Sequence, residues 1–185
     1  MQFDIPREIL DYAKLTYRHY VPNRRASGFK ELASQERGSG DLSDLLASLC
    51  VYFLFCENKK VCKLDLTSGV GDKDDISIRI KNIWKHVNVK TSSYAPFRDG
   101  LNLYVKKEEL PKDNIDIYIQ CFVHLEETKT PHIHIAGWMD TSDELWNKAK
   151  ENLIFIPKAN HMGVGIKVEN LFKFDDLVSK IDSKF

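Results

Sequence analysis

A hairpin pattern in the middle of the chain most constrains the fold. Three isoleucines alternate with polar residues over positions 76–80, which is the period-two pattern of a strand with one buried face. A Lys-Asn break follows, and positions 84–91 predict a returning strand. On this second strand, side chains two apart share a face, so Asn88 and Lys90 are predicted to point the same way. The sequence therefore predicts a β-hairpin whose second strand carries a polar face.

The residues around this hairpin combine an acid, an amide and a lysine. Asp75 stands at the mouth of the first strand, and Asp72 and Asp74 precede it. Carboxylate and amide oxygens are ligands of hard divalent cations. The ammonium of Lys90 can orient an attacking water and offset charge at a phosphorus atom. The predicted arrangement of Asp75, Asn88 and Lys90 therefore suits metal-assisted cleavage of a phosphodiester.

At these residues the chain resembles the PD-(D/E)XK, or restriction-endonuclease-like, nuclease superfamily. The family motif is an Asp followed, after a short hairpin, by Asp or Glu, any residue, and Lys. Asp75 matches the first position and Lys90 the last, and the resemblance extends over about residues 41–138. It implies an α/β fold with a central mixed β-sheet flanked by helices, and a Mg²⁺- or Mn²⁺-dependent endonuclease acting on DNA. It also implies catalytic roles for Asp75, Asn88 and Lys90, with Asp75 and Asn88 as metal ligands.

The middle position of the motif departs from the family. Asn88 stands where the family has an acid, and its amide brings no negative charge, so a lower affinity for Mg²⁺ is expected. The family often places a further acid on the helix before the first catalytic strand. Residues 42–55 (LSDLLASLCVYFLF) predict a helix that is apolar on nearly all sides and therefore buried. The resemblance thus implies Asp44 as another metal ligand, although an acid near a helix N-terminus also simply complements the helix dipole.

Contacts with nucleic acid are predicted for local basic and polar residues, because the formal net charge of the chain is zero. Arg24, Arg25 and Arg37 lie in a loop-like stretch, and their guanidinium groups match phosphate geometry. Ser92 and Arg98 follow in the segment after the hairpin, where basic residues outnumber acidic ones. The alternative for the three N-terminal arginines is a solvated basic loop.

The 185 residues fit one domain, in which 1–40 form an N-terminal helix and basic loop, 41–138 the core and 139–185 a C-terminal part. The chain shows neither an apolar run long enough to span a membrane nor a signal peptide, so an intracellular, cytoplasmic protein is expected. Its four cysteines fit neither a disulfide framework nor a zinc site. Cutting both strands of duplex DNA would suit a homodimer, and by analogy a phage, mobile element or defence system is a plausible source.

The remaining pattern predicts strands and helices on either side of the hairpin. Besides the elements above, helices are predicted over 6–20, 141–151 and 175–181, and strands over 60–66, 101–105, 115–123, 132–139, 153–157 and 164–168. The last two strands are expected to be short edge strands. The layout predicted from these elements is one mixed sheet flanked by helices.

Two other functions remain open. Because Asn88 is uncharged, the same fold could hold nucleic acid or a protein partner without cutting it. Alternatively, the string HIHI places His132 and His134 on one strand face, with His124 nearby, which is a metal-ligand arrangement. This string resembles the His-hydrophobe-His motif of relaxases and replication initiators, which attack DNA with a tyrosine. The chain has no tyrosine after Tyr118, so such a nickase would have to use one upstream.

Overall fold

Two sheets and four α-helices make up the part of the chain that the computed structural model describes, which is residues 1–20, 39–65, 76–92, 102–110, 114–125, 130–156 and 161–184. The helices are α1 (Arg7–Tyr20), α3 (Ser39–Glu57), α4 (Glu144–Glu151) and α5 (Phe174–Lys180), with a 3-10 helix η1 (Val168–Asn170). The strands are β1 (Gln2–Asp4), β2 (Cys62–Leu64), β3 (Ile76–Ile80), β4 (Ile83–Ser92), β5 (Asn102–Lys106), β6 (Ile117–His124), β7 (His132–Asp140), β8 (Ile154–Ile156) and β9 (His161–Lys167). The predicted mixed α/β class is confirmed. No helix in these ranges is long and apolar enough to cross a membrane.

The larger sheet has the strand order β1-β7-β6-β4-β3-β2, and it contains the predicted hairpin as β3 and β4. Lys81 and Asn82 connect the two strands with φ angles of 51° and 65°, the left-handed conformation of a two-residue hairpin turn. The carboxylate of Asp182 accepts hydrogen bonds from both of their backbone N–H groups, at 2.9 and 3.0 Å. The turn is therefore fixed by a residue from the far end of the chain, and the hairpin prediction is confirmed.

Within the described part of this sheet, β4 and β6 are the parallel pair, while the other neighbours run antiparallel. Lys90 lies beside Gln120 and Thr91 beside Cys121 in their shared register. Because the strands run the same way, their carboxyl ends meet at one edge, where α/β sheets commonly bind ligands. The polar residues of β4 lie at this edge.

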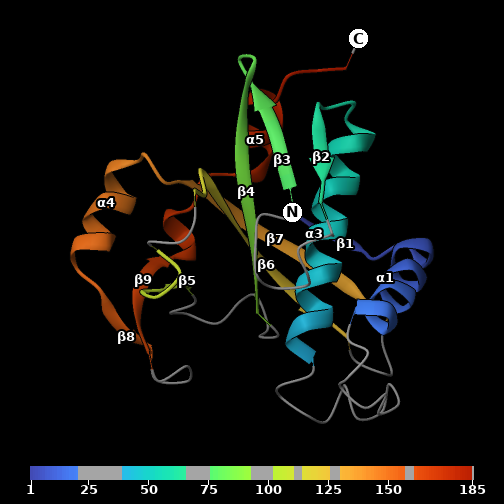
Figure 1. Ribbon diagram of the computed structural model, residues 1–185, viewed down its shortest axis with the longest axis horizontal. Coiled ribbons are helices and arrows are strands. Elements are labelled where there is room, and N and C mark those ends of the chain that lie inside the picture. The colour runs from blue at the N-terminus through green and yellow to red at the C-terminus, as the bar shows by residue number, and fades with distance from the viewer. Residues whose placement is uncertain are drawn as a thin grey trace.

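Helix α3 covers one face of the larger sheet (Figure 1). All of its residues from Leu42 to Val51 are buried except Asp44, which is half-buried. Val87 and Val89 of β4 belong to the same apolar core as this helix. The apolar side chains all round α3 therefore reflect its position between the sheet and α1, and the predicted buried helix is confirmed.

A second sheet, with the order β5-β9-β8, lies on the other side of β4 and β6 together with α4 (Figure 1). The predicted edge strands at 153–157 and 164–168 belong to this sheet and not to the edges of the larger one. Tyr118 and Met139 of the larger sheet join its apolar cluster, and the Tyr118 ring stacks on Trp146 of α4 with centroids 4.9 Å apart. The second sheet is thus a packed layer over the main sheet.

The four cysteines are free thiols, as expected from their irregular spacing. The sulfur atoms of Cys56 and Cys62 lie 3.7 Å apart, where α3 ends and β2 begins. Burial raises the pKa of Cys50 and of Cys62 to about 12, and the hydrogen bond between Cys62 and Cys56 adds to the shift at Cys62. Neither buried thiol is therefore a reactive nucleophile near neutral pH.

Candidate functional site

Strand β4 divides its side chains between two layers. Val87 and Val89 point into the core shared with α3, so Asn88 and Lys90 point to the opposite face, toward the second sheet. The predicted common face of Asn88 and Lys90 is confirmed by the continuous strand Ile83–Ser92. Ser92, the last residue of β4, follows on the same face by the same alternation and lies beside Phe122 in the register of β6.

Lys90 is held by a carboxylate that the sequence pattern did not single out. Its Nζ donates to Oε2 of Glu109 at 2.7 Å, and the two side chains are 23% and 32% exposed. The ammonium also lies 5.8 Å from the centroid of the Tyr118 ring. Lys90 is therefore a partly buried cation in a fixed position and not a freely moving surface lysine.

Asn88 contributes a buried oxygen to the same face. Its Oδ1 is shielded from solvent and accepts no hydrogen bond from the described residues. A buried acceptor without a donor is costly, by roughly 1–3 kcal/mol, unless a cation or another donor reaches it. An amide oxygen is also an acceptable ligand of Mg²⁺ or Mn²⁺. The chemistry at this position therefore fits a divalent cation.

Asp44 is anchored to the other face of β4. Its Oδ1 accepts a hydrogen bond from the hydroxyl of Thr91, the residue after Lys90. By strand alternation Thr91 points away from the face of Asn88 and Lys90. Asp44 thus lies near the carboxyl end of β4 but on the α3 side of the strand, so its described contact does not bring it to the face of Asn88 and Lys90.

Several predicted site residues lie outside the described residues. These are the acid Asp75 with its possible substitutes Asp72 and Asp74, and the arginines Arg24, Arg25, Arg37 and Arg98. Within the described ranges, no group of three or more His, Cys, Asp and Glu side chains could hold a metal ion. The described residues therefore do not include the complete predicted ligand set.

The histidines of the nickase alternative gather on the β6–β7 pair. His124 lies directly opposite His132, and their rings stack with centroids 4.4 Å apart and an angle of 8° between planes. Each imidazole directs its lone pairs within its own plane, so two parallel stacked rings cannot direct them to one ion. His134 lies two residues from His132 along β7, and burial is the main cause that lowers its pKa. The stack favours cross-strand packing of His124 and His132.

Gln120, beside Lys90 in the next strand, has a structural partner. Its side chain is buried, and its Nε2 donates to the carbonyl of Cys121 at 2.9 Å. Asp116, at the start of the same strand region, accepts hydrogen bonds from the Lys85 ammonium and the His86 backbone N–H, both at 2.8 Å. Asp116 thus connects β4 to the start of β6, whereas the described bond of Gln120 stays within β6.

Glu109 is the site residue that sequence reasoning missed. It lies in a turn nineteen positions after Lys90, next to Glu108, and no periodic pattern distinguishes one glutamate from the other. Only the docking of the second sheet brings Glu109 to β4. A lysine that is partly buried on a strand face is expected to pair with a carboxylate, but the sequence does not identify which acid this is.

Comparisons with protein-family models, with curated proteins and with solved structures give no match. Fold and geometry alone therefore define the class: a mixed α/β protein with a partly buried lysine–carboxylate pair at the carboxyl end of a parallel strand pair.

Proposed function

We propose that the chain is a metal-dependent endonuclease that hydrolyses phosphodiester bonds of DNA, built on a restriction-endonuclease-like core. The observation that carries this proposal is the common face of Asn88 and Lys90. It combines a buried amide oxygen without a hydrogen-bond donor among the described residues and an ammonium fixed by a carboxylate. Both lie where β4 runs parallel to β6, at an edge that suits ligand binding.

Each residue has a distinct role in the proposed reaction. Lys90 donates a hydrogen bond to the attacking water and offsets the charge that develops on the phosphate. Asp75 is proposed as the principal metal ligand and Asn88 as a weaker one, while Asp44, near the N-terminal end of α3, adds negative charge from the other side of β4. Bound Mg²⁺ or Mn²⁺ would supply Lewis-acid stabilisation of the phosphoryl oxygens.

DNA is the proposed partner, and a homodimer would allow both strands of a duplex to be cut. Arg24, Arg25, Arg37 and Arg98 are proposed to bind backbone phosphates, since guanidinium groups form two-point contacts with them. Ser92, at the end of β4 next to the site, is proposed as a further polar contact to the DNA backbone.

A binding protein without catalysis is the second candidate, and Asn88 favours it. Because Asn88 is neutral, the described charges at this face of β4 are the ammonium of Lys90 and the carboxylate of its partner Glu109. A site with so little negative charge would hold a divalent cation weakly. The same surface would then bind nucleic acid or a partner protein without hydrolysis.

Cleavage of plasmid and oligonucleotide substrates in Mg²⁺ and in Mn²⁺ tests these two candidates. Wild type is expected to cut, and Lys90→Ala to lose about 10²-fold or more of the rate, because a fixed donor at the reacting centre is removed. Asn88→Asp is expected to cut faster at limiting metal, because it adds a charged ligand. Lys85→Ala is the matched control, since Lys85 also lies on β4 and pairs with a carboxylate, that of Asp116 at 2.8 Å.

The control should retain wild-type cleavage. If wild type and Asn88→Asp are both folded and cut nothing in either metal, the nuclease proposal fails and the binding protein remains. Equal losses in Lys90→Ala and Lys85→Ala would also count against a specific role for Lys90.

A further inference from the structure

We propose that Glu109 is a ligand of the divalent cation, supplying from the second sheet the negative charge that Asn88 lacks in β4. The inference rests on the proposed function, because it concerns the same site. It differs in assigning a carboxylate that lies outside the hairpin and outside any motif in the sequence. The ligand class is a hard divalent cation with Mg²⁺- or Mn²⁺-like preferences.

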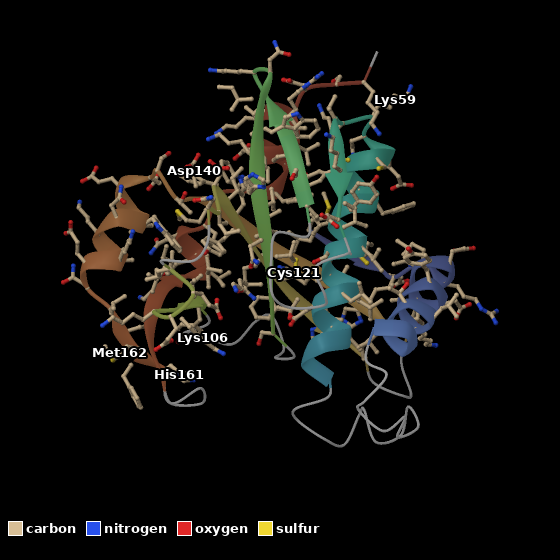
Figure 2. All side chains as sticks on the ribbon, viewed as in Figure 1. Lys59, Lys106, Cys121, Asp140, His161 and Met162 are labelled. Atoms are coloured by element: carbon tan, nitrogen blue, oxygen red, sulfur yellow. The ribbon has the colours of Figure 1, made fainter. Side chains whose placement is uncertain are left out.

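The position of Glu109 is fixed by the backbone around it. Its N–H donates to the carbonyl of Lys106 at 3.0 Å, which closes a turn at the end of β5. The N–H of Lys107 donates to the carbonyl of Met162 at 3.0 Å, and Leu110 packs on the apolar cluster of the second sheet. Figure 2 shows Lys106 beside Met162 at the same end of the β5–β9 pair. The carboxylate is thus presented to β4 by an ordered turn.

The neighbours of Glu109 suit a cation. One carboxylate oxygen, Oε2, accepts from Lys90, and a carboxylate has a second oxygen with its own lone pairs. Asn88 Oδ1, buried and without a hydrogen-bond donor among the described residues, lies on the same face two residues before Lys90. The Cα atoms of two such residues are about 7 Å apart along a strand, and the proposed ion lies on this face between the Asn88 oxygen and the Glu109 carboxylate. Mg²⁺ typically needs only one or two carboxylates besides waters and phosphate oxygens.

Glu109 also balances the positive charge of Lys90 at this face of β4. Without it, Lys90 would leave the face with a net positive charge, which repels a divalent cation. With Glu109 present, the ammonium is neutralised, and the pair of Lys90 and Glu109 carries no net charge. Glu109 therefore both holds Lys90 in place and makes the face compatible with a cation.

The test is a titration of the full chain with Mn²⁺. Binding is measured by calorimetry and by the electron paramagnetic resonance signal of free Mn²⁺. Wild type is expected to bind, and Glu109→Gln to bind about tenfold more weakly or worse, because a charged ligand is lost. Glu108→Gln is the matched control: the neighbouring side chain is exposed, and its removal should leave affinity unchanged within about twofold. The double variant Glu109→Gln with Asn88→Asp should regain most of the affinity, because the charge returns from the β4 side. Circular dichroism confirms that each variant is folded.

The outcomes separate the two proposals. Equal Mn²⁺ affinity in wild type and in folded Glu109→Gln overturns the ligand role and leaves Glu109 as a structural partner of Lys90, whatever the cleavage assay shows. Binding that follows the expected pattern without any DNA cleavage supports the ligand role and refutes the nuclease. Absence of Mn²⁺ binding in both wild type and Asn88→Asp overturns the ligand role together with the metal-dependent activity.

Discussion

Replacing Thr91 by valine tests the contact that ties α3 to the carboxyl end of β4. Valine keeps the shape of threonine but removes the hydroxyl that donates to the Asp44 carboxylate. A hydrogen bond to a charged group contributes about 1.5–3 kcal/mol, and because both side chains are half-buried, we expect a loss near the lower end, about 1.5 kcal/mol. With a urea m-value of about 2 kcal/mol/M, the unfolding midpoint should fall by about 0.7 M. For a chain of this size the melting temperature should fall by roughly 3–6 °C.

Thr91→Ser is the control, because it keeps the donor and removes only a methyl group, at a cost of about 0.8 kcal/mol or less. A double-mutant cycle of Thr91→Val with Asp44→Ala isolates the interaction, and a coupling of about 1–2 kcal/mol is expected. A coupling below about 0.5 kcal/mol, the level of ordinary additivity, would refute the reasoning. Asp44 would then not be anchored at the end of β4, and its proposed place near the metal site would lose its structural support.

Two further predictions concern the frame that holds the site. The backbone N–H groups of Asn82 and Lys81 lower the pKa of Asp182 in the folded protein. The stability that this carboxylate contributes is therefore fully present above its unfolded pKa of about 4. It is lost as the pH falls through the lower folded pKa. Stability should therefore decline more steeply with falling pH below about pH 4 in wild type than in Asp182→Asn, as measured by unfolding at a series of acid pH values, and identical slopes would contradict this account. Gly137→Ala would place a Cβ 2.6 Å from the backbone oxygen of Phe172. The free energy of unfolding in urea is therefore expected to fall by about 2 kcal/mol or more. An unchanged urea midpoint would show that the backbone at Gly137 does not contact the backbone at Phe172.

The elements that the sequence predicts best are those with a local pattern. The alternation over 76–80 and the Lys-Asn break are enough to predict the hairpin, because the period of a strand and the conformation of a turn depend on neighbouring residues. The apolar residues on all sides of α3 likewise indicate burial without any knowledge of the partner. The common face of Asn88 and Lys90 follows directly from the same alternation, so this part of the site was within reach of the sequence.

The partners of these elements were not predictable in the same way. Short apolar runs at 153–157 and 164–168 indicate strands, but nothing local distinguishes an edge of the main sheet from a separate sheet. Strand β1, Gln2–Asp4, is too short for a period and forms because β7 offers an open edge. Asp44 was predicted near the site from a resemblance, while its contact with Thr91 required the packing of α3 on the sheet.

The two described contacts of the Lys90 ammonium come from different sheets. Glu109 lies in the turn that ends β5, whereas Tyr118 belongs to β6 of the larger sheet, where its ring stacks on Trp146 of α4. The position of the lysine therefore depends in part on the docking of the second sheet, whose strands the sequence analysis placed in one mixed sheet with the hairpin. Local opening of the β5–β9 pair would break the Lys90–Glu109 pair, while the apolar core between the main sheet and α3 contains no residue of that pair. The hairpin supplies Asn88 and Lys90 of the proposed site, and the turn after β5 supplies the carboxylate that pairs with Lys90.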